Sequence, residues 1–313
     1  NIKKYKSNFP EFDDKNNFPD NIMEELLIHF NKHNLSNDNL VKPDIFGDAY
    51  EYLLAEFASE TKKKGGQFYT PHEVVRLLVL LTKPKEGMRI CDPTCGSGGM
   101  LVQSWSFVKE KKGNPDNITL HGQESNYSTV GMSKMNLVLH GVSDFRIEHG
   151  DTLDNPLLQE DGKLLSYDRV LANFPFSENW KAQGKENDPY DRFRLGIPPA
   201  KDKADFAFIQ HMYSTLNDKG QAAIISSQGV LFRGSTEAAI RQGLYDEDAV
   251  EAIIALPTKL FFGTGIPGCI LLLNKNKPKE RKGKILFVYA AKDYQEEKNR
   301  NILREKDLKK IVS

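Results

Sequence analysis

The segment Asp92-Pro93-Thr94-Cys95-Gly96-Ser97-Gly98-Gly99 directly follows the apolar run Met88-Arg89-Ile90-Cys91. This order predicts a buried strand that ends in a glycine-rich loop and then opens a helix. The glycines let the backbone bend tightly and approach a ligand without a Cβ collision. Free N–H groups at the start of the helix suit a carboxylate. A tight strand-to-helix turn without any ligand accounts equally well for this loop taken alone.

A second apolar run, Tyr167–Ala172, leads into the tetrapeptide Asn173-Phe174-Pro175-Phe176. The side-chain oxygen of Asn173 and the backbone carbonyl of Phe174 are two acceptors that can hold both N–H bonds of an aromatic amine. Pro175 stiffens the loop, and Phe176 offers a ring face on which a base can stack. The alternative is a strand that ends in an Asn turn with core aromatics.

From residue 67 onward, short apolar runs alternate with helical patterns. This alternation predicts an α/β fold with a doubly wound, mostly parallel, Rossmann-like sheet. We expect strands at residues 88–91, 118–122, 145–148, 169–172, 222–226, 250–255, 269–273 and 285–290. We expect helices at residues 71–81, 98–111, 126–140, 204–216 and 235–243, the first of them with Thr70 as its N-cap.

The two ends of the chain read as helical. Residues 1–64 are expected to form a small N-terminal helical domain, with one helix over 21–31 and a second from Asp44. The apolar stripe expected on the second helix consists of Ile45, Tyr52, Leu53 and Phe57. The lysine- and glycine-rich run 61–66 suggests a boundary, so residues 65–291 form the sheet domain. Residues 292–313, helix-like over 296–312, are expected to begin a C-terminal helical segment.

The bulk composition limits the classes of function. Lys plus Arg (43) equals Asp plus Glu (43), so no global positive field favours unaided binding to a duplex, although local basic patches remain possible. Three cysteines are too few for a disulfide frame or a zinc cage, which fits a reducing cytoplasm. No membrane span or signal peptide is visible. Because the chain begins at Asn1, we expect it to be part of a longer protein.

Three acidic residues sit where strands of the expected sheet end. Asp92 can bind an ammonium group directly or through water. Glu124 can accept hydrogen bonds from both ribose hydroxyls, although a solvent-exposed loop acid is the alternative. In Gly150-Asp151-Thr152-Leu153, Asp151 can accept from an adenine amino group while Leu153 packs on the ring. No Gly-Lys-Ser/Thr triplet occurs, so an adenosine-bearing cofactor without phosphates is favoured.

The loops that follow Cys91 and Ala172 therefore predict an enzyme that methylates adenine from S-adenosylmethionine. The methyl group on a sulfonium is already activated, so in-line transfer needs positioning more than a strong base. Neither a catalytic triad nor a metal is required for this chemistry.

Several motifs occur in the order found in a known family: Gln67-Phe68-Tyr69-Thr70-Pro71, Asp92–Gly99, Glu124, Asp151 and Asn173–Phe176. The chain resembles N6-adenine DNA methyltransferases, and more specifically the modification (methylase) subunit of type I restriction–modification systems. In this family Asn-Pro-Pro is common, whereas this chain has Phe174 at the second position.

The resemblance implies roles for individual residues. Asn173, Phe174, Pro175 and Phe176 would form the target-base site. Phe262 is a candidate second stacking surface, for which core packing is an equally good account. The residues that would contact S-adenosylmethionine are Gln67, Phe68, Tyr69, Thr70, Pro71, His72, Asp92, Thr94, Gly96, Ser97, Gly98, Gly99, Glu124, Asp151, Thr152 and Leu153.

The resemblance also implies partners. A specificity subunit reads the sequence of the duplex DNA, a second copy of the modification subunit completes the clamp, and a restriction (motor-nuclease) subunit cuts unmodified DNA. The expected activity is site-specific N6-adenine methylation of DNA in the cytoplasm, after the base is flipped out. Two alternatives stay open: methylation of a protein glutamine or an RNA base, and a non-catalytic scaffold that binds the cofactor.

Overall fold

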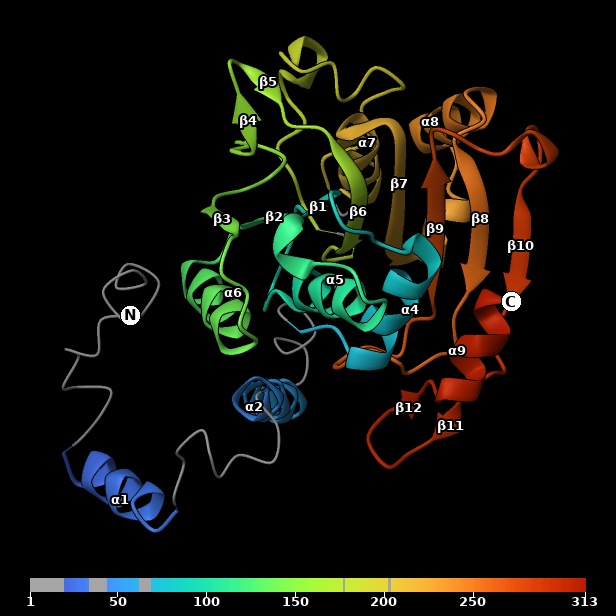
Figure 1. The fold of residues 1–313 in the computed structure, drawn as a ribbon. Helices are drawn as coiled ribbons and strands as arrows, with labels where there is room; N and C mark the ends of the chain where they lie inside the picture. Colours follow the sequence, from blue (N-terminus) through green and yellow to red (C-terminus); the bar gives the residue numbers. More distant parts are fainter. Residues whose placement is uncertain (1–19, 34–43, 62–68, 177, 202–203) are drawn as a thin grey trace.

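The computed structural model describes residues 20–33, 44–61, 69–176, 178–201 and 204–313, which contain an eight-stranded sheet between two layers of helices (Figure 1). Its strands are β1 (Arg89–Asp92), β2 (Thr119–Glu124), β3 (Arg146–His149), β6 (Tyr167–Asn173), β7 (Leu216–Ser227), β8 (Val250–Ala255), β9 (Gly268–Asn274) and β10 (Leu286–Tyr289). Their order in space is β10-β8-β9-β7-β6-β1-β2-β3. Every strand overlaps one that the sequence predicts.

The direction of the strands confirms the doubly wound, mostly parallel sheet. β1 pairs in parallel with β2 on one side and with β6 on the other. From β1 the chain builds outward to β3, and it then crosses to β6 and builds the other half, so the strand order reverses between β1 and β6. Only β9 runs antiparallel, between β7 and β8. Ligands of such sheets bind beyond the carboxyl ends of the strands at this reversal.

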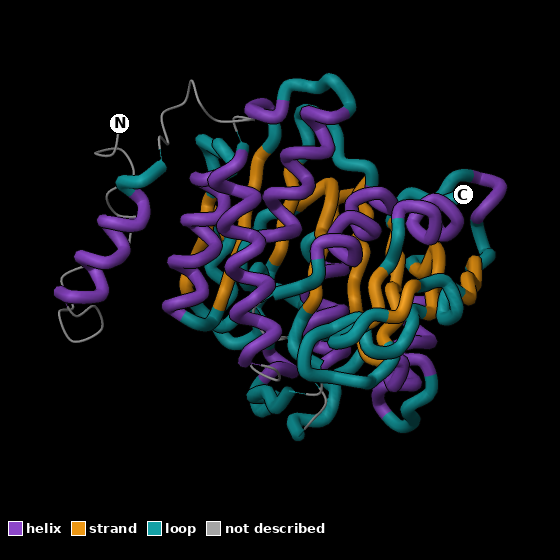
Figure 2. Tube along the Cα trace, turned by 90° about the horizontal axis from the view of Figure 1, so that it is seen from below, coloured by secondary structure: helices purple, strands orange, loops and turns teal. Residues whose placement is uncertain are grey.

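Helices cover both faces of the sheet (Figures 1 and 2). α4 (His72–Thr82), α5 (Gly99–Glu110) and α6 (Tyr127–Leu139) contribute to one hydrophobic core. α7 (Asp205–Ser214) and α8 (Thr236–Asp246) contribute to the other. β7 serves both, because Ala223 and Ile225 belong to the first core while Ala222 and Ile224 belong to the second. A strand buried on both faces in this way reads as a continuous apolar run.

Short elements connect these layers. They are η3 (Pro115–Asn117), η4 (Lys185–Asn187), η5 (Gln228–Leu231), η6 (Lys279–Arg281), the hairpin β4 (Gln159–Glu160) and β5 (Lys163–Leu164), and the hairpin β11 (Gln295–Glu296) and β12 (Asn301–Ile302). The chain ends in α9 (Glu305–Val312).

The N-terminal part contains the two expected helices, α1 (Asp20–Phe30) and α2 (Ile45–Thr61). The apolar stripe expected on α2 is wrong, because Tyr52, Leu53 and Phe57 are exposed while Leu54 and Ala58 are buried. α2 packs against α6, and the Tyr50 hydroxyl donates to a backbone carbonyl of that helix. The buried stripe of a surface helix depends on the tertiary packing, which the helical pattern of the sequence alone does not locate.

The continuous helix expected over residues 296–312 is also wrong. Asn301 lies in β12, where its backbone N–H donates to the carbonyl of Lys259 and its side chain donates to the carbonyl of Thr258, each over 2.8 Å. This tertiary contact needs an extended backbone and overrides the local helical preference. Leu303 and the apolar residues of α9 then join the core beside α4.

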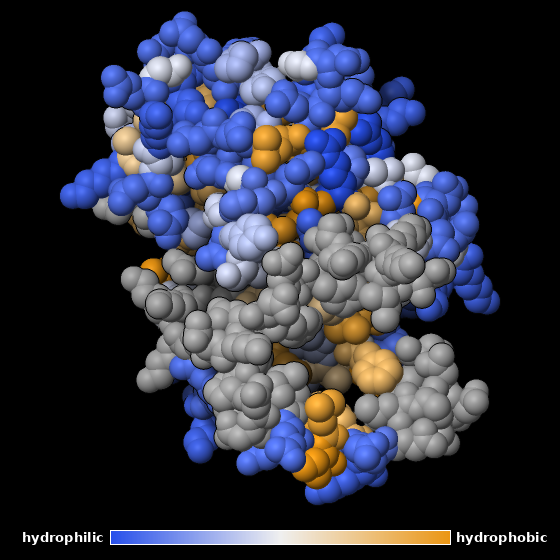
Figure 3. All heavy atoms as spheres, turned by 90° about the vertical axis from the view of Figure 1, so that its left-hand side faces the viewer, coloured by the Kyte–Doolittle hydropathy of each residue, from blue (hydrophilic) through white to orange (hydrophobic). Residues whose placement is uncertain are grey.

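The surface carries its apolar residues in several places. On the face shown in Figure 3 the coloured atoms are mainly hydrophilic, with separate hydrophobic spots. Exposed apolar side chains include Leu27, Ile28 and Phe30 of α1. None of the helices within the described residues combines the length and the apolar composition that a membrane crossing requires.

Candidate active site

The carboxyl ends of β1 and β6 meet at the reversal of strand order. Ile90 and Cys91 pair with Arg169 and Val170, so the residues that follow the two strands lie at the same edge of the sheet. A cavity opens there. It is lined by Tyr69, Thr70, Val75, Asp92, Thr94, Cys95, Gly96, Ser97, Gly99, Met100 and Asn173.

Most of the lining residues are ones that the sequence predicts. Val75, Cys95 and Met100 were not expected to contact a ligand. Val75 lies in the first turn of α4, and Met100 directly follows the glycine loop in α5. The first turn of a helix that begins at a ligand loop projects toward the same ligand, and this placement is the signal that identifies both residues.

The Asn173 side chain is held in one orientation. Its Nδ2 donates to Thr70 Oγ1 over 3.0 Å, whereas its buried Oδ1 has no hydrogen-bond partner among the described residues. Leaving a buried acceptor unpaired is costly, so such atoms mark a place where a ligand completes the hydrogen bonding.

The predicted capping role of Thr70 is wrong. Pro71 occupies the N-cap position of α4, and no side chain caps that helix. Pro71 itself is buried and does not line the cavity. The Thr70 hydroxyl accepts the hydrogen bond from Asn173 instead, because the carboxyl end of β6 lies beside it.

Asp92 is almost fully buried, with 2% of its surface exposed. One carboxylate oxygen accepts from the backbone N–H of Thr94 over 3.0 Å. Desolvation by burial raises the pKa of Asp92 to about 8, and the negative charge of Glu124 also raises it. At neutral pH the carboxyl group therefore holds a proton, and a cationic ligand group in the cavity would favour its ionised form.

Glu124 stabilises the glycine loop. Its Oε2 accepts from the backbone N–H of Gly96 over 3.0 Å, and its Oε1 accepts from the backbone N–H of Asn126 over 2.8 Å. The carboxylate does not line the cavity itself. Its contact with a ribose thus stays a prediction, supported by the position of Glu124 at the carboxyl end of β2.

α6 contacts the same glycine loop and supports it. Gly98 has φ +80°, and a Cβ atom there would come within 2.7 Å of Ser133 Oγ. Asn136 Nδ2 donates to the Ser97 carbonyl over 3.0 Å. Gly98 is therefore required by its backbone conformation and by the close approach of the helix, and it does not line the cavity.

The residues after β3 do not reach the cavity lining. Asp151 is exposed, and its carboxylate accepts from the backbone N–H groups of Leu153 and Asp154 over 2.8 and 3.0 Å. The Thr152 hydroxyl donates to the carbonyl of Pro93 over 2.5 Å and so braces the loop after β1. Leu153 is buried in the core that α7 and α8 share. The packing of Leu153 on a cofactor ring stays a prediction.

The aromatic residues after β6 differ in exposure. The Phe174 side chain is buried and stacks on Phe208 with ring centroids 5.0 Å apart. A contact of its backbone carbonyl with a ligand stays a prediction. Pro175 and Phe176 are half-buried, and Phe176 packs edge-on against Phe261. Phe176 therefore keeps ring surface near the edge of the sheet.

Phe262 lies in the loop between β8 and β9. Its half-buried ring lies 5.9 Å from the ring of Tyr69, and the Arg300 guanidinium lies 5.2 Å from its centroid. Arg300 also pairs with Glu73 of α4. These contacts place Phe262 next to Tyr69, which lines the cavity. The two residues are 193 positions apart in the sequence, so no local pattern predicts this contact.

The other predicted residues lie farther away or outside the described part. His72 is exposed and contacts Gln103 through its Nε2 over 2.8 Å, outside the cavity lining. Gln67 and Phe68 lie outside the described residues.

The chain matches the N-6 DNA Methylase family model over residues 41–313. It is 40% identical, over 306 residues, to the type I restriction enzyme MjaVII methylase subunit of Methanocaldococcus jannaschii, covering 93% of this chain and 50% of that protein. It is 36% identical, over 267 residues, to the type I restriction enzyme HindI methylase subunit of Haemophilus influenzae, covering 84% and 58%.

A solved structure gives the same result. The crystal structure of the type I restriction-modification system methyltransferase subunit from Streptococcus thermophilus matches with a TM-score of 0.80 and 35% identity, covering 93% of this chain and 60% of that one. The chain spans about half the length of the curated relatives it matches. By its sequence, its sheet and the loops at the reversal of strand order, the chain belongs to the N-6 DNA methylase family.

Proposed function

We propose that the chain transfers a methyl group from S-adenosylmethionine to N6 of adenine in duplex DNA, as the modification subunit of a type I restriction–modification complex. The observation that carries the proposal is the buried, unpartnered Oδ1 of Asn173 in the cavity formed by the loop after β1. An acceptor held in this way suits the amino group of a target base.

The residues present fit S-adenosylmethionine. Asp92 would hold the ammonium group, and the start of α5 would hold the carboxylate through its free N–H groups. Glu124 and Asp151 would accept from the ribose hydroxyls and the adenine amino group. When bound, the cofactor supplies a methyl group already activated on a sulfonium.

The target adenine would enter after leaving the base stack. Asn173 Oδ1 and the Phe174 carbonyl would each accept one N–H bond of its amino group, which orients the nitrogen lone pair and helps to free it from the ring. Phe176 and Phe262 are the candidate stacking surfaces. Rate enhancement would then come from positioning rather than from a strong base.

Partner subunits would recognise the DNA sequence. The equal numbers of acidic and basic residues, 43 each, support DNA contacts shared with a specificity subunit and a second modification subunit. A restriction subunit would complete the complex, which we expect to act in the cytoplasm.

The test uses the full-length subunit assembled with its specificity subunit, methyl-labelled cofactor, and duplex DNA that contains the recognition site. We expect label on N6 of adenine. Asn173→Ala should lower transfer by at least about 100-fold with little loss of cofactor binding, whereas the exposed Asn276→Ala should behave like wild type. Full transfer by Asn173→Ala would refute the catalytic role, and label on RNA or on protein glutamine alone would refute the substrate.

A further inference from the structure

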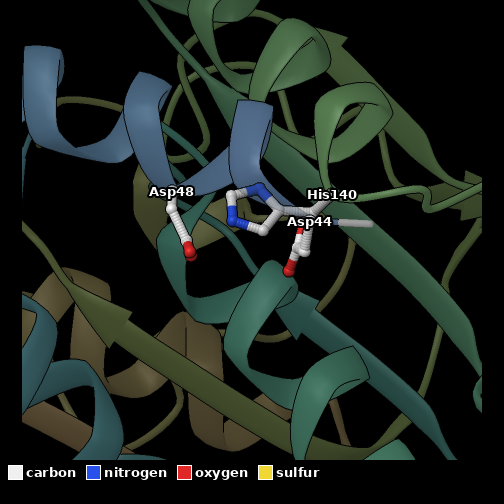
Figure 4. A group of neighbouring side chains, drawn as sticks. All are labelled: Asp44, Asp48 and His140. Carbon is white, nitrogen blue, oxygen red and sulfur yellow. The ribbon is translucent and has the colours of Figure 1, made fainter. Parts of the chain in front are cut away.

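A cluster of three metal-ligating side chains lies where α2 packs on α6, away from the cavity lining. Asp44 precedes α2, Asp48 lies in its first turn, and His140 ends α6. One oxygen or nitrogen atom from each lies within 4.8 Å of the other two. Figure 4 shows the imidazole of His140 between the two carboxyl groups. The cluster thus joins two helices that are distant in sequence.

A hydrogen bond within α6 determines which ring nitrogen of His140 carries the proton. His140 is 7% exposed, and its Nδ1 lies 2.9 Å from the carbonyl of Asn136. A carbonyl only accepts, so Nδ1 carries the proton, and in neutral histidine Nε2 presents a lone pair. Histidines that bind metals commonly donate their second N–H to a backbone carbonyl in this way.

Gly47 allows the three groups to come together. A Cβ atom at this position would lie 2.7 Å from Asp44 Oδ1 and 2.7 Å from His140 Cδ2. Lone pairs and negative charge gathered around one point are stabilised by a cation.

We propose that Asp44, Asp48 and His140 bind one divalent first-row transition metal ion, with Zn²⁺ as the best match, which clamps α2 to α6. An imidazole with two carboxylates favours zinc over magnesium or calcium, which prefer all-oxygen sites. Ligand atoms at about 2.0–2.2 Å from zinc lie closer together than 4.8 Å, so binding draws the side chains inward. Asp48 is the exposed member of the three. The proposal does not depend on methyl transfer.

The experiment titrates ZnCl₂ into the chelator-treated full-length protein and follows heat and thermal unfolding. We expect one equivalent to bind and Tm to rise by about 4 °C when free Zn²⁺ is 100 times Kd. Asp48→Asn, which keeps the shape of an exposed side chain, should weaken binding at least tenfold. Glu56→Gln, an exposed substitution on the same helix, is the control and should bind like wild type.

Substituting Co²⁺ gives a second readout, since its visible bands report nitrogen and oxygen coordination and should disappear in His140→Gln. Sub-stoichiometric or absent binding, or equal binding by wild type and Asp48→Asn, would overturn the proposal. So would Tm values that follow pH alone and do not respond to Zn²⁺, since an imidazolium ion would then balance the carboxylates.

Discussion

Asn173 and Thr70, which are 103 residues apart in sequence, are joined by a 3.0 Å hydrogen bond from the Asn173 side-chain amide to the Thr70 hydroxyl. This bond determines which end of the amide is left for the cavity. Because Nδ2 is already engaged, Oδ1 is the atom that can accept from a ligand. The segment before α4 therefore acts on the proposed chemistry by orienting a catalytic side chain.

Thr70→Val tests this relationship. The substitution keeps the side-chain shape but removes the acceptor, so the Asn173 amide is free to rotate. We expect kcat for methyl transfer to fall about 10- to 100-fold while KM for DNA and Kd for the cofactor change less than about threefold. The exposed Thr258→Val is the matched control. A loss confined to cofactor affinity would contradict the positioning role.

Asp92→Asn tests the effect of burial on stability. The pKa of Asp92 is about 8 in the fold against 3.8 in the unfolded chain, so the fold prefers the protonated form. The stability that the fold gains from the protonated carboxyl group is complete below pH 4 and is lost as pH rises toward 8. Without ligand, the variant should match wild type near pH 4 and be more stable by at least about 2 kcal/mol at pH 8 to 9. Urea unfolding across this range measures the difference, and the exposed Asp116→Asn should show none.

The same carboxyl group predicts the pH dependence of cofactor binding. Below pH 8, Asp92 must release its proton before it can pair with the ammonium group of the cofactor. We expect affinity to rise by up to about tenfold per pH unit between pH 6 and 8. Calorimetry in buffers of different ionisation enthalpy should detect proton release in wild type and none in Asp92→Asn. A flat profile for wild type would exclude this contact.

Gly98→Ala tests the support of the glycine loop by α6. A Cβ atom at φ +80° is strained and would lie 2.7 Å from Ser133 Oγ. We expect the free energy of unfolding to fall by about 1–3 kcal/mol. Gly131→Ala, inside α6 with open space around it, should instead raise it by about 0.5–1 kcal/mol. Similar effects of the two changes in denaturant titrations would show that the close approach does not matter.

Phe262→Ala tests the second stacking surface. If the ring stacks on the flipped adenine, its loss should lower kcat/KM for DNA by about 10- to 100-fold, in line with stacking energies of about 1–3 kcal/mol per base. The fluorescence of 2-aminopurine at the target position would rise in the variant complex because quenching by the ring is removed. Phe287→Ala, in the exposed edge strand β10, serves as the control. Unchanged kinetics would leave Phe262 a packing residue.

The sheet and the two loops at Asp92 and Asn173 could be predicted because their determinants are local. Short apolar runs bounded by glycine, proline and acidic residues locate strands, and the loops follow directly after two of them. The hydrogen bond between Asn173 and Thr70 could not be predicted. A threonine directly before a helix is typically its N-cap, and only the tertiary structure places the end of β6 beside Thr70. Asn301 is similar, since its extended backbone depends on the loop after β8.

The buried face of α2 shows the same limit. Its apolar residues are numerous enough to support several stripes, and only the tertiary structure determines that Leu54 and Ala58 are the buried ones. The cluster of Asp44, Asp48 and His140 depends on that packing as well. Neither feature follows from one element considered alone.

Asn136 links two parts of the molecule through a single residue. Its side chain holds the Ser97 carbonyl of the cofactor loop, and its backbone carbonyl accepts from His140, which faces α2. α2 is thus distant from the glycine loop along the chain but is connected to it through His140 and Asn136. Changes on α2 should therefore be non-additive with the loss of the Asn136 side chain, so that a double-mutant cycle of Asp48→Asn with Asn136→Ala would give a coupling energy different from zero.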